Sequence, residues 1–300
     1  MKLVAPTFLS AVVALTAPSA TVVAKVGTGL GPCGSVAYRG YLYVANYGSN
    51  TIARVDPRTN RRVRTLRVGL RPCGLVAGGG ALWVDGFGSN TIEKVDPKRF
   101  RVVRRIRVGS QPYDVAYGFG YVWASNNGDG TVSKIDPKRG RVVKTIRTGG
   151  GPAGFRIAAG SVWLGSTGDG IVRRITPATN RVTEIDLKTN LPAWLEATDD
   201  AVWIANGGDG TVTRLDPRTN RVVATIRVGS GPADGVVGTD GLVWIPNQRD
   251  NTISRIDPAT NGVVSTVPTG KNPFVVRRAF GDMWASSFAG STVWRIRASG

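Results

Sequence analysis

A repeat of forty residues runs through the chain and restricts it to folds that are built from equal modules. Its clearest marker is a proline that recurs every 40 residues, with one interval of 41, at Pro32, Pro72, Pro112, Pro152, Pro192, Pro232 and Pro273. An aromatic residue follows each proline by eleven positions, or by twelve in the sixth copy: Tyr43, Trp83, Trp123, Trp163, Trp203, Trp244 and Trp284. Periods of this length are typical of solenoids and propellers, in which each module buries its apolar surface against the next.

Each copy predicts four short β-strands separated by tight turns. The aromatic lies in a short apolar run and is followed by a glycine-rich turn such as Gly128-Asp129-Gly130, then by Thr-Ile or Thr-Val in most copies. An Asp-Pro turn comes next in most copies, and the copy ends on an alternating run such as residues 222–228. β-branched and aromatic runs between turn signals indicate strands, and we find no stretch with helical periodicity. We therefore predict an all-β chain that forms a seven-bladed β-propeller of four-stranded blades.

The two ends of the repeat array complement each other. The last copy starts at Pro273 and runs out after its third strand, over residues 293–297. The pattern of the missing fourth strand occurs at the other end of the array, in residues 22–27. Because a ring leaves few exposed strand edges when its first and last segments share a sheet, we expect the N-terminal strand to close the last blade.

The first twenty residues predict an export signal. Met1 and Lys2 precede an apolar run over residues 3–14, and small residues follow up to Ala20. This arrangement is typical of a secretory signal peptide over residues 1–20 that is cleaved near Ala20, although a buried N-terminal segment would also fit. We expect one propeller domain over residues 21–300, secreted or associated with the cell envelope. We expect a monomer without a membrane span, because no other segment approaches the length needed to cross a bilayer.

The repeat resembles two known propeller groups. Copies share the phrasing Gly-x-Gly-Pro, Tyr-Val-Ala-Asn and Asp-Pro-Arg-Thr-Asn, found in the first copy at residues 29–32, 43–46 and 56–60. This unit resembles the YVTN-type repeat, and it is similar to the repeat of streptogramin lyases of the virginiamycin B lyase type. The first resemblance implies an exported or surface-associated binding or scaffold protein. The second implies a seven-bladed ring and a lyase mechanism that depends on histidine and acidic metal ligands.

The chain contains no histidine, so the lyase catalytic residues have no counterpart in it. The same absence excludes Ser-His-Asp triads, Cys-His dyads and histidine-ligated zinc. We therefore expect a non-catalytic propeller that needs no cofactor and binds a ligand or partner at its central funnel. The alternative is a metal-dependent lyase or lactonase that uses carboxylates and a divalent metal. An acidic hydrolase site would have to use Glu196 with Asp234 or Asp114.

The innermost strand of each copy offers the candidate site. Two and four residues after the repeat proline, most copies carry small or apolar residues, and six positions depart from this pattern: Asp114, Arg156, Trp194, Glu196, Asp234 and Arg277. A repeat scaffold displays its ligand site where it departs from its own consensus. We predict that these six residues line the funnel and bind a polar, sugar-like or peptide-like ligand, with Trp194 as a stacking platform. Salt bridges of Arg156 with Glu196 and of Arg277 with Asp234, serving only to satisfy buried charge, are the alternative.

Two further patterns concern the turns and the cysteines. The Asp-Pro-x-Thr-Asn segments could suggest metal ligands, but they are typical of turns in which Asp accepts backbone N–H groups and Asn adopts the left-handed conformation. Cys33 and Cys73 occupy the same position in adjacent copies. In an exported chain two such cysteines are more often bonded than free, so we predict a Cys33–Cys73 disulfide.

The basic charge is concentrated in the first three copies. The chain has 39 Lys and Arg against 20 Asp and Glu, and a cationic arc is expected on the outer rim at Arg61, Arg62, Arg64, Arg67, Arg101, Arg104, Arg105 and Arg107. Charges on exposed outer strands protect against edge pairing and improve solubility. They would also attract anionic cell-envelope polymers, anionic lipid headgroups or nucleic acid. No aromatic side chains alternate with these arginines, so we expect no specific nucleic-acid binding.

Overall fold

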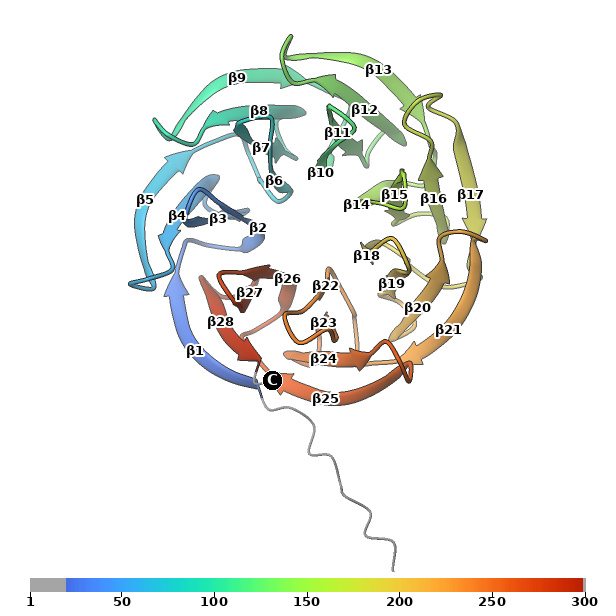
Figure 1. Cartoon of the computed structure of the whole chain (residues 1–300). Helices are drawn as coiled ribbons and strands as arrows, with labels where there is room; N and C mark the ends of the chain where they lie inside the picture. Colours follow the sequence, from blue (N-terminus) through green and yellow to red (C-terminus); the bar gives the residue numbers. More distant parts are fainter. Residues whose placement is uncertain (1–19, 299–300) are drawn as a thin grey trace, which may run out of the picture.

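The computed structural model describes residues 20–298, which form one closed ring of seven four-stranded antiparallel sheets (Figure 1). The predicted all-β, seven-bladed propeller is confirmed. The predicted signal peptide lies outside the described residues, apart from Ala20. No helix within residues 20–298 is long and apolar enough to cross a membrane.

Each blade is numbered from the copy that supplies its innermost strand. Blade 1 contains β2 (Pro32–Tyr38), β3 (Tyr41–Asn46), β4 (Thr51–Asp56) and β5 (Arg61–Arg67). Blade 2 contains β6 (Leu75–Gly78), β7 (Ala81–Gly86), β8 (Thr91–Asp96) and β9 (Arg101–Arg107). Blade 3 contains β10 (Pro112–Gly118), β11 (Tyr121–Asn126), β12 (Thr131–Asp136) and β13 (Arg141–Arg147). Blade 4 contains β14 (Pro152–Ala158), β15 (Ser161–Ser166), β16 (Ile171–Ile175) and β17 (Val182–Asp186).

The remaining blades follow the same order. Blade 5 contains β18 (Trp194–Ala197), β19 (Val202–Asn206), β20 (Thr211–Asp216) and β21 (Arg221–Arg227). Blade 6 contains β22 (Val236–Val237), β23 (Val243–Asn247), β24 (Thr252–Asp257) and β25 (Gly262–Pro268). Blade 7 contains β26 (Pro273–Ala279), β27 (Asp282–Ser287), β28 (Thr292–Ala298) and, as its outermost strand, β1 (Ala20–Gly27).

The N-terminal strand closes the ring. β1 pairs antiparallel with β28, with Val22 opposite Ile296 and Val26 opposite Val293. Blade 7 is therefore assembled from both ends of the chain, as the repeat pattern predicts. Figure 1 shows β1 and β28 side by side, with β1 continuing the outer circle of strands. Opening this blade would expose the edge of β28, so the pairing protects the ring from edge-to-edge association.

The repeated aromatic fills the space between adjacent blades. All seven side chains are at most 2% exposed, and each lies in an apolar cluster with residues of the following blade. Trp284 of blade 7, for example, packs with Leu42 and Val44 of blade 1. The core is thus divided into seven interfaces around the ring. Burial of one large aromatic per interface explains why this column must stay aromatic while its neighbours vary.

A second repeated feature joins the blades through their third strands. A Lys or Arg near the middle of each third strand lies over an aromatic ring of its own blade, at Arg54, Lys94, Lys134, Arg174, Arg214, Arg255 and Arg295. Five of them also donate to the proline carbonyl of the next Asp-Pro or related turn, among them Arg214 Nη1 to Pro258 O at 2.5 Å. The turn interpretation of these segments is confirmed: Asp56 Oδ1 accepts the Arg58 amide, and Asn60 has φ of 54°.

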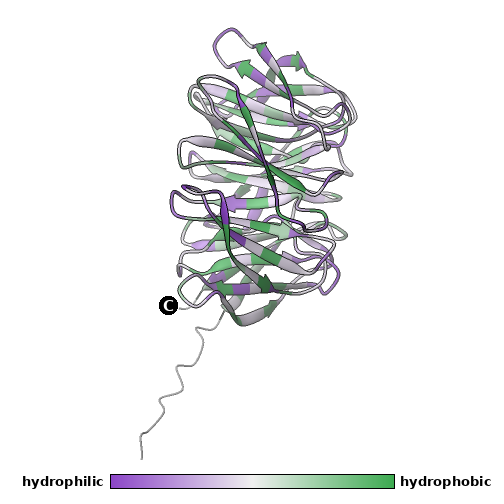
Figure 2. Ribbon diagram, turned by 90° about the vertical axis from the view of Figure 1, so that its right-hand side faces the viewer, coloured by the Kyte–Doolittle hydropathy of each residue, from purple (hydrophilic) through white to green (hydrophobic). Residues whose placement is uncertain are grey.

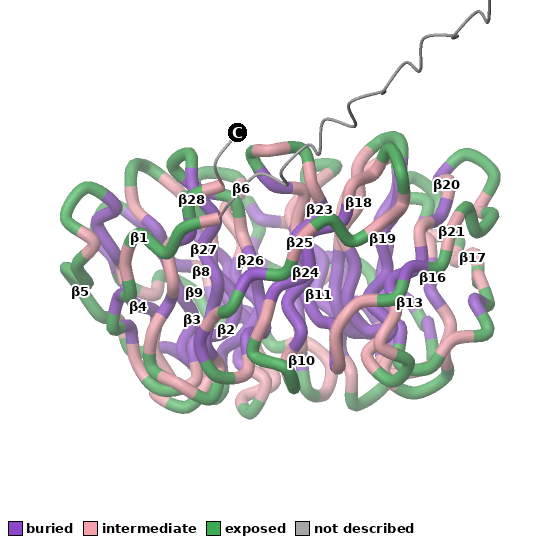
Figure 3. Tube along the Cα trace, turned by 90° about the horizontal axis from the view of Figure 1, so that it is seen from below, coloured by how far each residue is buried: buried purple, intermediate pink, exposed green. Residues whose placement is uncertain are grey.

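The molecule is a disc with two different faces. Figure 2 shows it from the edge, and Figure 3 shows buried backbone at the middle and exposed turns at both rims. The start of each innermost strand lies beside the end of the second strand, as Pro32 lies opposite Asn46. One face therefore carries the connections between blades, and we call it the connection face. The opposite face carries the hairpins between first and second strands, and we call it the hairpin face.

Candidate functional site

The innermost strands of several neighbouring blades come close enough to form backbone hydrogen bonds with each other near their start. Gly34 N donates to Cys73 O at 3.1 Å, and Gly154 N donates to Ala193 O at 3.0 Å. A Cβ atom added at Gly34 would lie 2.3 Å from Cys73 O, so this contact requires glycine. The centre of the ring is narrow here, and side chains from different blades meet across it.

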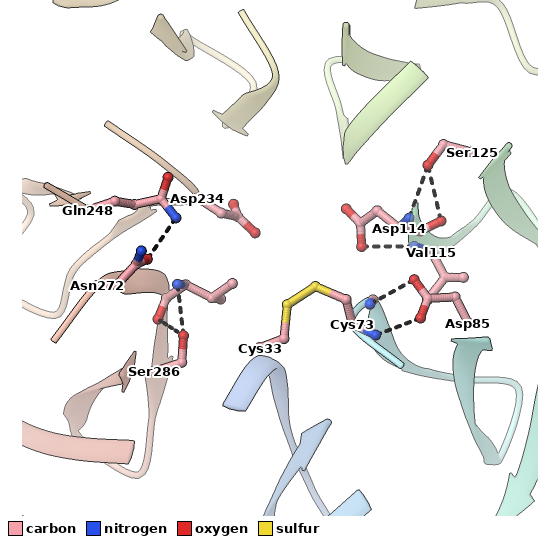
Figure 4. The surroundings of a disulfide bond; sticks show 12 residues. Cys33, Cys73, Asp85, Asp114, Val115, Ser125, Asp234, Gln248, Asn272 and Ser286 are labelled. Atoms are coloured by element: carbon pink, nitrogen blue, oxygen red, sulfur yellow. Dashed lines mark hydrogen bonds between the residues drawn. A yellow bond between two sulfur atoms is a disulfide. The ribbon is translucent and has the colours of Figure 1, made fainter. Parts of the chain in front are cut away.

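A disulfide between Cys33 and Cys73 ties blades 1 and 2 together at this level. The two Cα atoms are 5.0 Å apart. Figure 4 shows the buried Asp85 carboxylate beside this bond, where it accepts the backbone amides of Cys73 at 2.7 Å and Gly74 at 2.9 Å. Burial raises the pKa of Asp85 well above its usual range. Asp85 therefore fixes the backbone that carries Cys73.

Six aromatic side chains form a closed collar around the disulfide on the connection face. Consecutive rings around it contact one another with centroids 4.9 to 6.3 Å apart, in the order Tyr47, Phe87, Tyr113, Trp194, Phe274 and Phe288, and Phe288 returns to Tyr47. Trp194 and Phe274 are buried and form its floor, while Tyr47, Phe87 and Phe288 remain partly exposed. Tilted and edge-to-face contacts of this kind hold aromatic rings in fixed orientations.

The collar lines a cavity without charged side chains, which we call the aromatic mouth. A cavity of about 400 Å³ is bordered by the disulfide, five of the collar rings and the side chains of Thr167, Gln248 and Asn272. Gln248 Nε2 donates to Asn272 Oδ1 at 3.0 Å, so part of this polar wall is ordered by its own hydrogen bond. Burial raises the pKa of Tyr113 to about 12, and no acidic or basic side chain lines the cavity. The mouth thus combines aromatic surface with neutral hydrogen-bonding groups.

The hairpin face of the channel is charged and internally paired. Arg156 Nε donates to Glu196 Oε2 at 2.7 Å, and the two arginines Arg156 and Arg277 each bind one oxygen of Asp234. Asp234 is 2% exposed, so its charge is almost fully removed from water. Arg156 is 16% exposed, and its partial burial opposes its charge, but the carboxylates of Asp234 and Glu196 outweigh this effect and raise the pKa of Arg156. These four residues bring together blades 4, 5, 6 and 7.

Asp114 stands apart from these ion pairs. Its Oδ2 atom accepts the Phe155 amide at 2.9 Å, and its own backbone is held by Ser125. Burial raises its pKa to about 6, helped by the nearby Asp234 and opposed by Arg156. Asp114 lines a second cavity of about 410 Å³, which also borders Arg156, Asp234 and Arg277 and opens toward Arg278.

The six predicted site residues are therefore divided between two surfaces. Asp114, Arg156, Asp234 and Arg277 line the hairpin-face cavity, and Glu196 is bound to Arg156 beside it. Trp194 borders both cavities, with its ring in the collar. Both ion pairs that the alternative hypothesis names are present, and Arg156 additionally binds Asp234. Within residues 20–298, no three His, Cys, Asp or Glu side chains gather in a way that could hold a metal ion.

Sequence reasoning missed the exposed part of the collar. Tyr47, Phe87 and Phe288 all occupy the first position after the second strand, fifteen residues beyond the repeat proline. The equivalent positions in the other blades are Asn127, Thr167, Gly207 and Gln248. This column departs from a consensus as clearly as the innermost strand does. The same comparison of equivalent positions, made for this column, would have found the mouth.

Comparisons with known proteins agree with the architecture. A family model described as a repeat of unknown function (DUF6923) matches residues 72–194, which correspond to blades 2–4 and the start of blade 5. No curated protein sequence matches the chain. Solved propellers nevertheless superpose on it closely.

A streptogramin B lyase is 18% identical, with 90% of this chain and 94% of that chain covered and a TM-score of 0.79. A catalytically inactive virginiamycin B lyase of Staphylococcus aureus with quinupristin is 15% identical, with 93% and 99% covered and a TM-score of 0.80. The hydrazine synthase of Kuenenia stuttgartiensis is 19% identical, with 90% and 96% covered and a TM-score of 0.80. The resemblance to the lyase propellers is confirmed. At these identities it establishes the fold and leaves the activity open.

Proposed function

We propose that this protein is an exported, non-catalytic propeller that binds a small, uncharged, sugar-like ligand in the aromatic mouth of its connection face. The observation that carries the proposal is the neutrality of a cavity of about 400 Å³ at the centre of the ring, bordered by aromatic rings on one side and by amide and hydroxyl groups on the other. Ligand pockets of this size typically combine apolar surface with a few fixed polar groups. A sugar ring offers a matching apolar face and hydroxyl edges.

The charged cavity on the hairpin face supports binding of a polar ligand less well. Arg156 and Arg277 are already paired with Asp234 and Glu196, so a ligand that used these two arginines would have to replace buried ion pairs. Breaking such a pair costs several kcal/mol because a buried charge is left without a partner. We therefore assign Arg156, Glu196, Asp234 and Arg277 to holding the inner strands together, while Trp194 keeps its predicted role as a stacking platform.

The lyase or lactonase alternative would use Asp114, Glu196 and Asp234 as acid, base or metal ligands. Glu196 and Asp234 are instead bound to arginines, and Asp114 accepts a backbone amide. Export is supported by the apolar N-terminal segment and by the disulfide, because disulfides persist in oxidising compartments. The same two features support a secreted or cell-envelope location.

A glycan-array screen followed by titration of the best neutral oligosaccharide tests the proposal. Tyr47→Ala and Phe288→Ala each remove a partly exposed collar ring and should weaken binding by about 3-fold to 10-fold, the usual worth of one aromatic contact. Phe280→Ala is the matched control, since Phe280 is an exposed aromatic of the same blade on the hairpin face. An equal loss of affinity in all three variants would contradict the proposal. So would binding that only Arg277→Gln abolishes, because Arg277 lines the charged cavity of the hairpin face.

A further inference from the structure

The outer wall of the ring is unevenly charged. β5, β9 and β13 are the outermost strands of three consecutive blades (Figure 1) and carry the exposed Arg61, Arg62, Arg64, Arg67, Arg101, Arg104, Arg105, Arg107, Arg141, Lys144 and Arg147. β25 of blade 6 has no charged residue, and β17 of blade 4 carries Glu184 and Asp186. Protection of strand edges would call for charge on every outer strand. It does not explain a cationic arc that covers three neighbouring blades.

Most of the arc has no internal counter-charge. Among the described residues, Arg105 is the one member that forms an ion pair, with Glu93 at 2.7 Å. Arg62 Nη1 donates to the Thr28 carbonyl at 2.9 Å, and Arg64 lies over the Phe100 ring at 5.5 Å. These contacts orient the guanidinium groups without neutralising them. A dense row of positive charge held in this way costs stability through self-repulsion unless an anion covers it.

A groove runs between two of these strands. It has a volume of about 1030 Å³ and lies between β9 and β13, with Arg107 and Arg147 on its two sides and Thr131 and Thr145 between them. The one carboxylate in its lining, Asp129, is engaged: Oδ2 accepts the Ser110 amide at 2.8 Å and Oδ1 accepts the Thr131 hydroxyl at 2.7 Å. Two arginines and a threonine hydroxyl from adjacent blades therefore line the same groove.

We propose that this wall binds a flexible linear polyanion with phosphate groups, and that one phosphate is held in the groove between Arg107 and Arg147. Guanidinium groups bind phosphate through paired hydrogen bonds, and the Thr145 hydroxyl, exposed in the groove, can supply a further donor. The remaining arginines of β5 and β9 would contact successive phosphates along the arc. This site is separate from the aromatic mouth, so the proposal does not depend on the proposed function.

The shape of the wall selects the class of partner. The arc is convex, because its strands lie tangentially around a disc (Figure 1). A flat bilayer can touch such a wall along one blade only, and duplex DNA is stiff over about 150 base pairs. A flexible chain can follow the curve and contact all three blades. Single-stranded nucleic acid is flexible too, but no exposed aromatic side chains on β5, β9 or β13 offer a stacking surface for its bases.

Binding of long-chain inorganic polyphosphate to the purified protein tests the proposal. We compare Arg107→Gln/Arg147→Gln with Arg221→Gln/Arg227→Gln on β21, next to the uncharged β25. Arg227 is equivalent to Arg107 and Arg147, and Arg221 is the exposed arginine at the start of the same strand. Both variants lose two surface charges, so their net charges match. At low salt the first should bind about 30-fold more weakly and the second less than about 3-fold. The slope of log K against log salt should become shallower by about 1.4 in the first variant only.

Three results would overturn the proposal. The first is an equal loss of affinity in both variants, which would mean diffuse attraction without a site. The second is no binding of polyphosphate by the wild-type protein. The third is tighter binding to a single-stranded oligonucleotide of matched charge, or to vesicles of phosphatidylglycerol and phosphatidylcholine, than to polyphosphate.

Discussion

Replacing Arg295 by methionine should destabilise the ring at the interface where its two chain ends meet. Arg295 lies on β28 of blade 7, and its Nη1 atom donates to Pro57 O at 2.6 Å and to Asn60 Oδ1 at 2.9 Å in blade 1. Its Nε atom donates to Asp282 Oδ2 at 2.5 Å, and Asp282 is 3% exposed. Methionine retains most of the packing of the aliphatic stem but removes every polar contact.

The magnitude follows from these contacts. Hydrogen bonds from a charged donor contribute about 1.5 to 3 kcal/mol, so we assign about 2 kcal/mol to the shared Nη1 donor. Asp282 keeps one partner, Arg297, at 3.1 Å. The penalty for a buried carboxylate is therefore partial, and we add about 1 kcal/mol. The total of about 3 kcal/mol corresponds to a fall in Tm of roughly 6–12 °C for a chain of this size.

Arg214→Met is the matched control, and urea denaturation is the assay. Arg214 makes the equivalent bonds to Pro258 and Asn261 between blades 5 and 6 but has no carboxylate partner among the described residues, so about 2 kcal/mol should be lost. The reasoning is refuted if Arg295→Met lies within about 0.5 kcal/mol of the wild-type protein, the range of ordinary surface substitutions. A larger loss for Arg214→Met would also refute it.

Three further outcomes are expected. Because the folded-state pKa of Asp114 is raised to about 6 from 3.8, the protonated form stabilises the fold; this contribution is complete below about pH 4 and is lost as pH rises through 6. Loss of this contribution lowers the free energy of unfolding by about 3 kcal/mol. Asp114→Asn should remove this part of the pH dependence of urea unfolding. Parallel curves of unfolding free energy against pH for the wild type and the variant would contradict this prediction. The double variant Cys33→Ala/Cys73→Ala should lose about 4 kcal/mol for opening a 40-residue loop, and two free thiols in the denatured, unreduced wild type would disprove the bond. Mg²⁺, Mn²⁺ and Ca²⁺ should leave Tm unchanged, and a rise with any of them would favour the metal-dependent lyase or lactonase.

The fold could be predicted from the sequence because the repeat constrains every blade independently. A proline, an aromatic and an Asp-Pro turn recur at fixed spacing in most copies, and the incomplete last copy shows where the N-terminal strand must pair. The packing of the repeated aromatic residues, Tyr43 and its tryptophan equivalents, between adjacent blades was predictable for the same reason. Each copy repeats the same physical requirement, so one irregular blade such as the sixth does not change the conclusion.

The partners at the centre of the ring could not be predicted in the same way. Arg156 and Asp234 are 78 residues apart and meet only because ring geometry brings blades 4 and 6 across one channel. Several innermost strands are irregular at their start, as between Pro112 and Asp114, which changes the direction of the side chains there. The indole of Trp194 contacts Tyr113 and Phe274 in the collar, although Trp194 also borders the charged cavity. A strict alternation of strand faces predicts a place for Trp194 among the charged residues only.

Hydrogen exchange of β1 tests most directly whether the two chain ends form one sheet. The closed ring, its two central cavities and its cationic outer wall all depend on this pairing. Paired with β28, the hydrogen-bonded amides of residues 21–27 should exchange as slowly as those of β21, which has the same outer position in a blade of continuous chain. Exchange of the β1 amides within seconds, while β21 stays protected, would contradict the closed ring.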